Sequence, residues 1–122
     1  MEKARFAGLN TVPSLRAHQI SLEGAGTSAP VVHEGVGVTV ARQAAGVYRI
    51  TWGSFPGRFV GVAATLGADD PADLAGYTAV RGAYSEANRT LDIRIASAAD
   101  AAADLGADEY LDLLVYFSTV NA

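Results

Sequence analysis

Tyr110-Leu-Asp-Leu-Leu-Val-Tyr-Phe-Ser-Thr-Val120 carries apolar side chains on both faces of what its alternation predicts to be a single β-strand. Successive side chains of a strand point to opposite faces. One face then holds Leu111, Leu113, Val115 and Phe117, and the other holds Tyr110, Leu114 and Tyr116, with Asp112 and Ser118 as its polar members. An ordinary surface strand alternates apolar with polar side chains, so this strand needs cover on both sides.

The second apolar face predicts association. One side of the strand is expected to face the core of the domain, and the other a second copy of the protein or a larger surface. We therefore predict a homo-oligomer, with a trimer as the favoured form, in which Leu114 and Tyr116 lie between subunits and Tyr110 lies beside them.

Length and composition are those of one soluble domain. A chain of 122 residues can bury a core of its own, and the absence of cysteine excludes disulfides and thiolate chemistry and fits a reducing cytoplasm. The sequence contains no recognisable secretion signal and no run of about 18 apolar residues that would span a membrane. We expect no membrane partner.

Charge is distributed unevenly along the chain. Residues 1–66 carry six Lys or Arg against three Glu, a net charge of +3, whereas residues 67–122 carry three Arg against ten Asp or Glu, a net charge of −7. Halves of opposite sign can steer copies of the chain toward one another, or they can simply be solvated faces. The overall charge of −4 and the wide spacing of Arg42, Arg49 and Arg58 argue against nucleic-acid binding.

Residues 1–30 are predicted to form an extended N-terminal arm. Its apolar residues are isolated, and prolines and a Gly/Ser/Ala run over residues 24–29 interrupt it, so no periodicity is sustained. Residues 18–22 could add as a strand to the edge of the domain or lie on a partner. The basic residues expected to dock the arm on a neighbouring chain or another protein surface are Lys3, Arg5 and Arg16.

From residue 31 onward, short strands alternate with turn signals. Strands are expected over residues 36–40, 47–52, 58–66, 77–84, 90–96 and 110–120, with hairpin turns over 42–46 and 86–89. Two of these strands alternate cleanly, one through Tyr48, Ile50 and Trp52 and the other through Leu91, Ile93 and Ile95. We expect these two sets of side chains to meet across a sandwich.

The strand pattern predicts an all-β fold. Because no helical pattern of about 10–15 residues separates the strands, we expect an antiparallel β-sandwich or jelly-roll-like domain over residues 31–122, not a parallel α/β fold. One helical candidate, residues 97–105, has Ser97 as a candidate N-cap and Gly106 as a stop, but an irregular loop fits this segment equally well.

No arrangement of residues predicts catalysis, so we expect neither an enzyme nor a cofactor. The glycine-rich residues 24–29 spell a loose dinucleotide-binding motif, but Pro30 and two valines follow where a helix would have to begin. His18 and His33 have no carboxylate at metal-ligand spacing apart from Glu34, and we expect them to be surface or interface residues.

Two acidic clusters remain, at residues 69–73 and 100–109. Neither has the ligand spacing of an EF-hand. We expect solvated loops, with a structural cation as the alternative.

The hairpin around residue 46 follows the pattern V-x-R-x-x-x-G-x-Y-x-V/I and is followed by the alternating residues 91–95 and the closing strand over 111–117. Over roughly residues 31–120 the chain thereby resembles the small β domains of tailed-bacteriophage virion proteins. In that family such a hairpin recurs in head-decoration, fibre and spike subunits, often in jelly-roll domains that assemble as trimers. The matching positions, for which the resemblance implies a structural role, are Val40, Arg42, Gly46, Tyr48 and Ile50.

The resemblance implies a compact structural subunit of a phage particle. Because the chain lacks a long fibrous repeat, a head decoration or cement protein, which bridges capsid subunits by burying interface area, fits better than a tail fibre. The expected partners are further copies of the chain and the major capsid protein or another virion protein. The expected location is the virion, after synthesis in the host cytoplasm. The alternative is a carbohydrate- or receptor-binding module of a spike or tail fibre, with an aromatic platform drawn from Trp52, Phe55, Phe59 and Tyr77.

Overall fold

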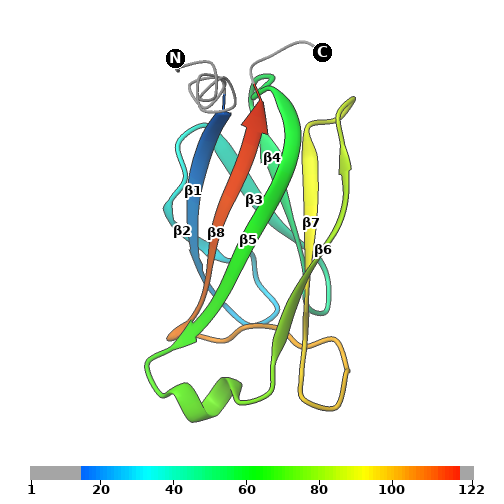
Figure 1. Cartoon of the computed structure of the whole chain (residues 1–122). Coiled ribbons are helices and arrows are strands. Elements are labelled where there is room, and N and C mark those ends of the chain that lie inside the picture. Colours follow the sequence, from blue (N-terminus) through cyan, green and yellow to red (C-terminus); the bar gives the residue numbers. More distant parts are fainter. Residues whose placement is uncertain (1–14, 119–122) are drawn as a thin grey trace, which may run out of the picture.

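The computed structural model describes residues 15–118, which form eight β-strands and one short 3-10 turn, η3 (Pro71–Leu74) (Figure 1). Sheet A contains, in spatial order, β2 (Val31–Glu34), β1 (Leu15–Glu23), β8 (Glu109–Ser118) and β5 (Arg58–Ala68). Sheet B contains β3 (Val38–Ala44), β4 (Val47–Trp52), β7 (Thr90–Ala96) and β6 (Thr78–Ser85). All neighbouring strands are antiparallel, so the predicted all-β class is confirmed. No helix within these residues is long and apolar enough to cross a membrane.

The core lies between the two sheets, which stack in a sandwich-like arrangement (Figure 1). Alternation turns one side of each central strand inward, as predicted. The buried inward residues include Leu111, Leu113, Val115 and Phe117 of β8, Tyr48, Ile50 and Trp52 of β4, and Leu91, Ile93 and Ile95 of β7. Burial of each such side chain contributes roughly 1.5–3 kcal/mol, so these faces supply the main stabilising term.

The predicted contact between β4 and β7 across the sandwich is wrong. The two strands are neighbours in sheet B, with Tyr48 beside Ile93. Trp52 of β4 instead packs against Phe117 of β8, with ring centroids 5.1 Å apart. Alternation indicates which side of a strand is buried, but it does not indicate which strand covers that side.

The predicted arm over residues 1–30 is not confirmed. Residues 15–23 form β1, which lies inside sheet A between β2 and β8 and pairs with β8 along its whole length. Its inward residues Ile20 and Leu22 are fully buried. The sequence predicts only residues 18–22 as a possible edge strand, because the first half of β1 is exposed and the alternating apolar run is short, whereas the structure places β1 inside the sheet.

The remaining expectations concern the jelly-roll arrangement and the basic docking residues of the arm. A jelly-roll arrangement is not confirmed, because the hairpins β1–β2, β3–β4 and β6–β7 each stay within one sheet. Residues 1–14, with Lys3 and Arg5, lie outside the described residues.

The connection from β7 to β8 is an irregular loop over residues 97–108, the second of the two predicted alternatives. The Asp104 carboxylate accepts two hydrogen bonds from the Arg42 guanidinium, at 2.8 and 2.9 Å, and one from the Gly46 N–H, at 2.9 Å. The backbone N–H of buried Leu105 donates to the Tyr48 hydroxyl at 2.8 Å. Three residues of the hairpin pattern thus hold this loop against the β3–β4 hairpin.

Candidate functional site

The strands β1, β8 and β5 lie side by side in sheet A and turn one surface, its outer face, away from the core (Figure 1). Most side chains on this outer face are small or apolar. The strand register arranges these side chains in rows across the three strands. The central row contains Gln19, Leu114 and Ala63. The rows on either side contain Ala17, Tyr116 and Gly61, and Ser21, Asp112 and Thr65.

Leu114 projects from the middle of this face. Its side chain is 39% exposed, and Tyr116, two residues along the same strand, is half-buried. The small neighbours Ala63 and Thr65 leave a shallow depression of about 290 Å³ beside Leu114. Across the three rows Asp112 is the one charged residue. A flat face with one projecting leucine and little charge suits close contact with another protein.

The outer face of sheet B has different chemistry. Arg49 of β4 and Asp92 of β7 lie side by side in its middle, joined by hydrogen bonds of 2.8 and 3.0 Å. The row beside this pair consists of Thr39, Thr51 and Thr90. Polar and paired side chains of this kind are typical of a sheet face in contact with water. The two outer faces are therefore not equivalent, and that of sheet A is the candidate for association.

One end of the outer face of sheet A carries a single basic residue, Arg58. Arg58 begins β5 on this face, in the same row as Leu15 and Ser118. Arg16 is exposed at the same end of the sheet.

The opposite end is acidic. Glu23 accepts a hydrogen bond from the backbone N–H of Asp108 at 2.9 Å and lies 2.7 Å from the ring Nε2 of His33. The hydrogen bond from Asp108, followed by that with His33, lowers the pKa of the Glu23 carboxyl, so it is ionised at neutral pH. Beside it, the Tyr110 hydroxyl donates to Asp69 at 2.9 Å, and this bond raises the pKa of Tyr110 to about 12. The two ends of this sheet therefore differ in charge.

The predicted interface residues do not all meet. Leu114 and Tyr116 lie together on the outer face, and Tyr110 lies on the same face at its acidic end. Arg16 stands opposite buried Phe117 in the register, which turns it toward the interior side at the open end of the sandwich. Lys3 and Arg5 are outside the range that the structure describes.

His18 is not the surface residue that the sequence predicts. Its Nδ1 accepts a hydrogen bond from Trp52 Nε1 at 3.2 Å, and its ring lies edge-on to Phe117 with centroids 5.2 Å apart. Burial, followed by the nearby charge of Arg16, lowers the pKa of His18. The sequence contains a signal for this position, because His18 lies two and four residues before the apolar residues at positions 20 and 22. In a strand this spacing places the His18 ring on the same, buried side of β1.

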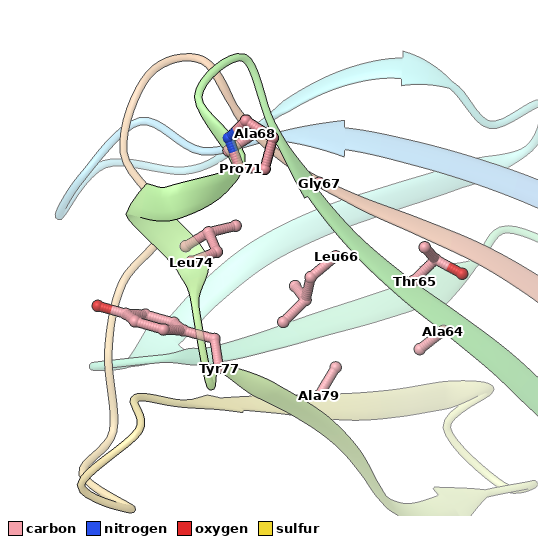
Figure 2. Close-up of a pocket in the computed structure, with 9 residues that line it drawn as sticks. All are labelled: Ala64, Thr65, Leu66, Gly67, Ala68, Pro71, Leu74, Tyr77 and Ala79. Carbon is pink, nitrogen blue, oxygen red and sulfur yellow. The ribbon is translucent and has the colours of Figure 1, made fainter.

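A second cavity, of about 390 Å³, lies between β5 and the segment formed by η3 and β6 (Figure 2). Leu66 and Leu74 point into it, whereas the hydroxyl of Tyr77 points away from Leu66 (Figure 2). None of the residues that line this cavity is charged. Thr65 and Tyr77 are the lining residues that carry a hydroxyl group. This lining offers few polar partners to a sugar.

The aromatic residues considered for a ligand platform are dispersed. Trp52 is buried, and Phe59 is stacked on Tyr84 with centroids 5.0 Å apart and covered by the Arg81 guanidinium. Phe55 is 57% exposed. No two of the four candidates are in ring contact within the described part of the chain.

Residues 15–118 contain no group of three or more His, Asp or Glu residues placed to hold a metal ion. In the acidic cluster over 69–73, Asp70 accepts the Ala72 N–H at the start of η3. In the other, Asp104 is engaged by Arg42, whose hydrogen bond lowers the pKa of that carboxyl. No protein-family model matches the chain, and searches of curated proteins and of solved structures found no significant match.

Proposed function

We propose that this protein is a structural subunit of a phage virion, a head decoration or cement protein that self-associates and bridges capsid subunits. One observation carries the proposal: the outer face of sheet A is nearly uncharged around a projecting Leu114, while the outer face of sheet B carries the charged residues Arg49, Asp92 and Arg94 beside the exposed Val80. The resemblance of the β3–β4 hairpin to virion β domains supports the same role. On this proposal the sandwich is a variant of the jelly-roll-like domains of such subunits, and any arm contributed by residues 1–14 serves attachment.

The proposed mechanism is burial of surface. A subunit that covers its apolar face on a neighbour, and repeats that contact many times over a particle, converts a modest affinity into durable attachment. The particle then resists opening because many contacts would have to break together. The homo-oligomer would be the unit that binds.

The first test replaces Leu114 with aspartate. A charge at this position should prevent cover of the outer face while leaving the core intact, because Leu114 is already 39% exposed. Light scattering should show an oligomer for the wild-type protein and folded monomers for Leu114→Asp. The matched control is Thr39→Asp, an exposed residue on the outer face of sheet B, which should leave the oligomer unchanged.

The second test concerns the particle. Wild-type protein and Leu114→Asp are each mixed with empty phage heads and sedimented. Retention of the wild type and loss of the variant would support the proposal. A wild-type protein that does not sediment with heads would overturn the proposed virion role, and one that stays monomeric at tens of micromolar would overturn self-association.

The alternative, a carbohydrate- or receptor-binding module, would have to use Phe55 or Tyr77, because Trp52 and Phe59 are engaged in the fold. Binding of the protein to a glycan array that is lost in Tyr77→Ala would favour this alternative.

A further inference from the structure

We propose that a second copy of this chain covers the outer face of sheet A, so that the two sheets A stack face to face. A two-fold axis passes through the contact at Leu114, and the strands of one copy run antiparallel to those of the other. The inference rests on the self-association proposed above, although not on where the assembly is located. Both copies would use the same surface, as a two-fold contact requires.

The shape of the face permits this contact. Three of the four neighbours of Leu114 and Tyr116 on β1 and β5 are small, namely Ala17, Ala63 and Gly61, and the fourth is Gln19 beside Leu114. Sheets normally stack about 10 Å apart, and small side chains allow the projecting leucine and tyrosine to be accommodated at that distance. Three strands of about nine residues give a footprint of roughly 400 Å² per copy, or about 800 Å² in total, which is less than the roughly 1,000 Å² of a stable interface and fits a weak contact. The dimer should therefore dissociate at micromolar concentrations.

Charge selects the antiparallel orientation. A two-fold axis along the strands would stack the acidic ends of the two copies, where Glu23 and Asp69 lie, on each other. A two-fold axis across the strands instead places each acidic end over the end of the partner that carries Arg58. Unlike charges then meet at both ends of the contact, and like charges are kept apart.

The row order specifies what would meet. With the axis at the central row, Leu114 of one copy contacts Leu114 of the second copy. Tyr116 lies over Asp112 of the second copy, where its hydroxyl can donate to an exposed carboxylate that is otherwise in contact with water. The two copies of Tyr116 are then about 13 Å apart along the strands, since four residues separate their rows.

Single-cysteine variants test this geometry directly, because the chain contains no cysteine. The full-length variants are treated with a short bis-maleimide and examined on denaturing gels. Leu114→Cys should give a cross-linked dimer, and Tyr116→Cys should not. The double variant Tyr116→Cys with Asp112→Cys should cross-link again. Thr39→Cys, on the outer face of sheet B, is the control that should remain monomeric on the gel.

A charge variant adds a thermodynamic readout. Arg58→Glu should raise the dimer dissociation constant several-fold, and added salt should weaken the wild-type dimer. Cross-linking of Tyr116→Cys as efficient as that of Leu114→Cys would replace the antiparallel orientation with the parallel one. A wild-type mass of a trimer, or cross-linking of Thr39→Cys, would overturn the two-fold contact. A monomer that sediments with phage heads would also overturn the two-fold contact but would leave the proposed virion role standing. A dimer that does not sediment with heads would support the two-fold contact and overturn the virion role.

Discussion

At the scale of single residues, Trp52 joins the two sheets. It is 2% exposed, lies edge-on to Phe117 of the opposite sheet and donates its indole N–H to His18. Trp52→Ala should therefore lower the free energy of unfolding by about 3–5 kcal/mol, measured by urea denaturation. Phe55→Ala, at a residue 57% exposed, is the control and should change little. Unchanged stability with loss of sugar or receptor binding would make Trp52 a ligand platform after all.

His18 makes stability depend on pH. Its pKa is lowered in the folded protein from an ordinary value of 6.5, so the unfolded chain binds a proton more readily than the folded one. The stabilising contribution is complete above pH 6.5 and declines as the pH falls toward the lowered pKa. Urea denaturation of the wild type between pH 8 and pH 5 should show this decline. His18→Asn retains an acceptor for the Trp52 N–H without titrating, and its decline should be smaller. An equal decline in both proteins would assign the effect to other groups.

At the scale of elements, Gly46 decides whether the β7–β8 loop can dock on the β3–β4 hairpin. Its φ is +69°, and a Cβ there would lie 2.6 Å from the Ile95 carbonyl oxygen and 2.7 Å from the Ala103 nitrogen. Gly26 has a similar φ of +65° with open space around it. Gly26→Ala should cost about 1 kcal/mol of backbone strain, and Gly46→Ala clearly more, because the loop must also move. Equal losses of thermal stability in the two variants would contradict a docking role for Gly46.

The sequence predicts individual elements better than it predicts their contacts. The inner faces of β4, β7 and β8 follow from period-2 alternation, which depends only on local geometry. The docking of the β7–β8 loop does not follow, because Asp104 meets Arg42 across 62 residues of chain. Three positions of the hairpin pattern were recognised as structural, but their partners lie in a segment whose own sequence fits a helix and a loop equally well.

At the scale of the whole molecule, β1 is part of the domain and not an appendage to it. Deleting residues 1–23 would remove buried Ile20 and Leu22 and leave β8 without one of its two neighbours. We expect this truncation to lose cooperative thermal unfolding in circular dichroism. A truncation of residues 1–14 retains every described element and should still unfold cooperatively. A folded protein lacking residues 1–23 would restore the arm as originally predicted.

Neither the order of strands in the sheets nor the place of β1 could be obtained from the sequence, because both depend on contacts between distant residues. Alternation shows that β8 needs cover on both faces, which led to Leu114 and Tyr116 as interface candidates. It carries no information about which strand edges lie beside β8, because register is set by distant partners, and Leu15 pairs with Ser118. The charge difference between the two ends of sheet A could not be obtained from the charges of the sequence halves, because Glu23 and Arg58 lie at opposite ends of the sheet although both belong to the basic half.

The central position of β8 also governs when the protein can fold. β8 is the last described strand along the chain, yet it alone joins β1 to β5. While the chain is being translated, β1 and β5 therefore stay unconnected until β8 has left the ribosome, although all strands of sheet B lie within residues 38–96 and are made earlier. We expect folding to be late and slow, since pairings of such long sequence separation must form against the entropy of loop closure. Nascent chains that stall before residue 109 would expose the unpaired edges of β1 and β5 and be prone to aggregate.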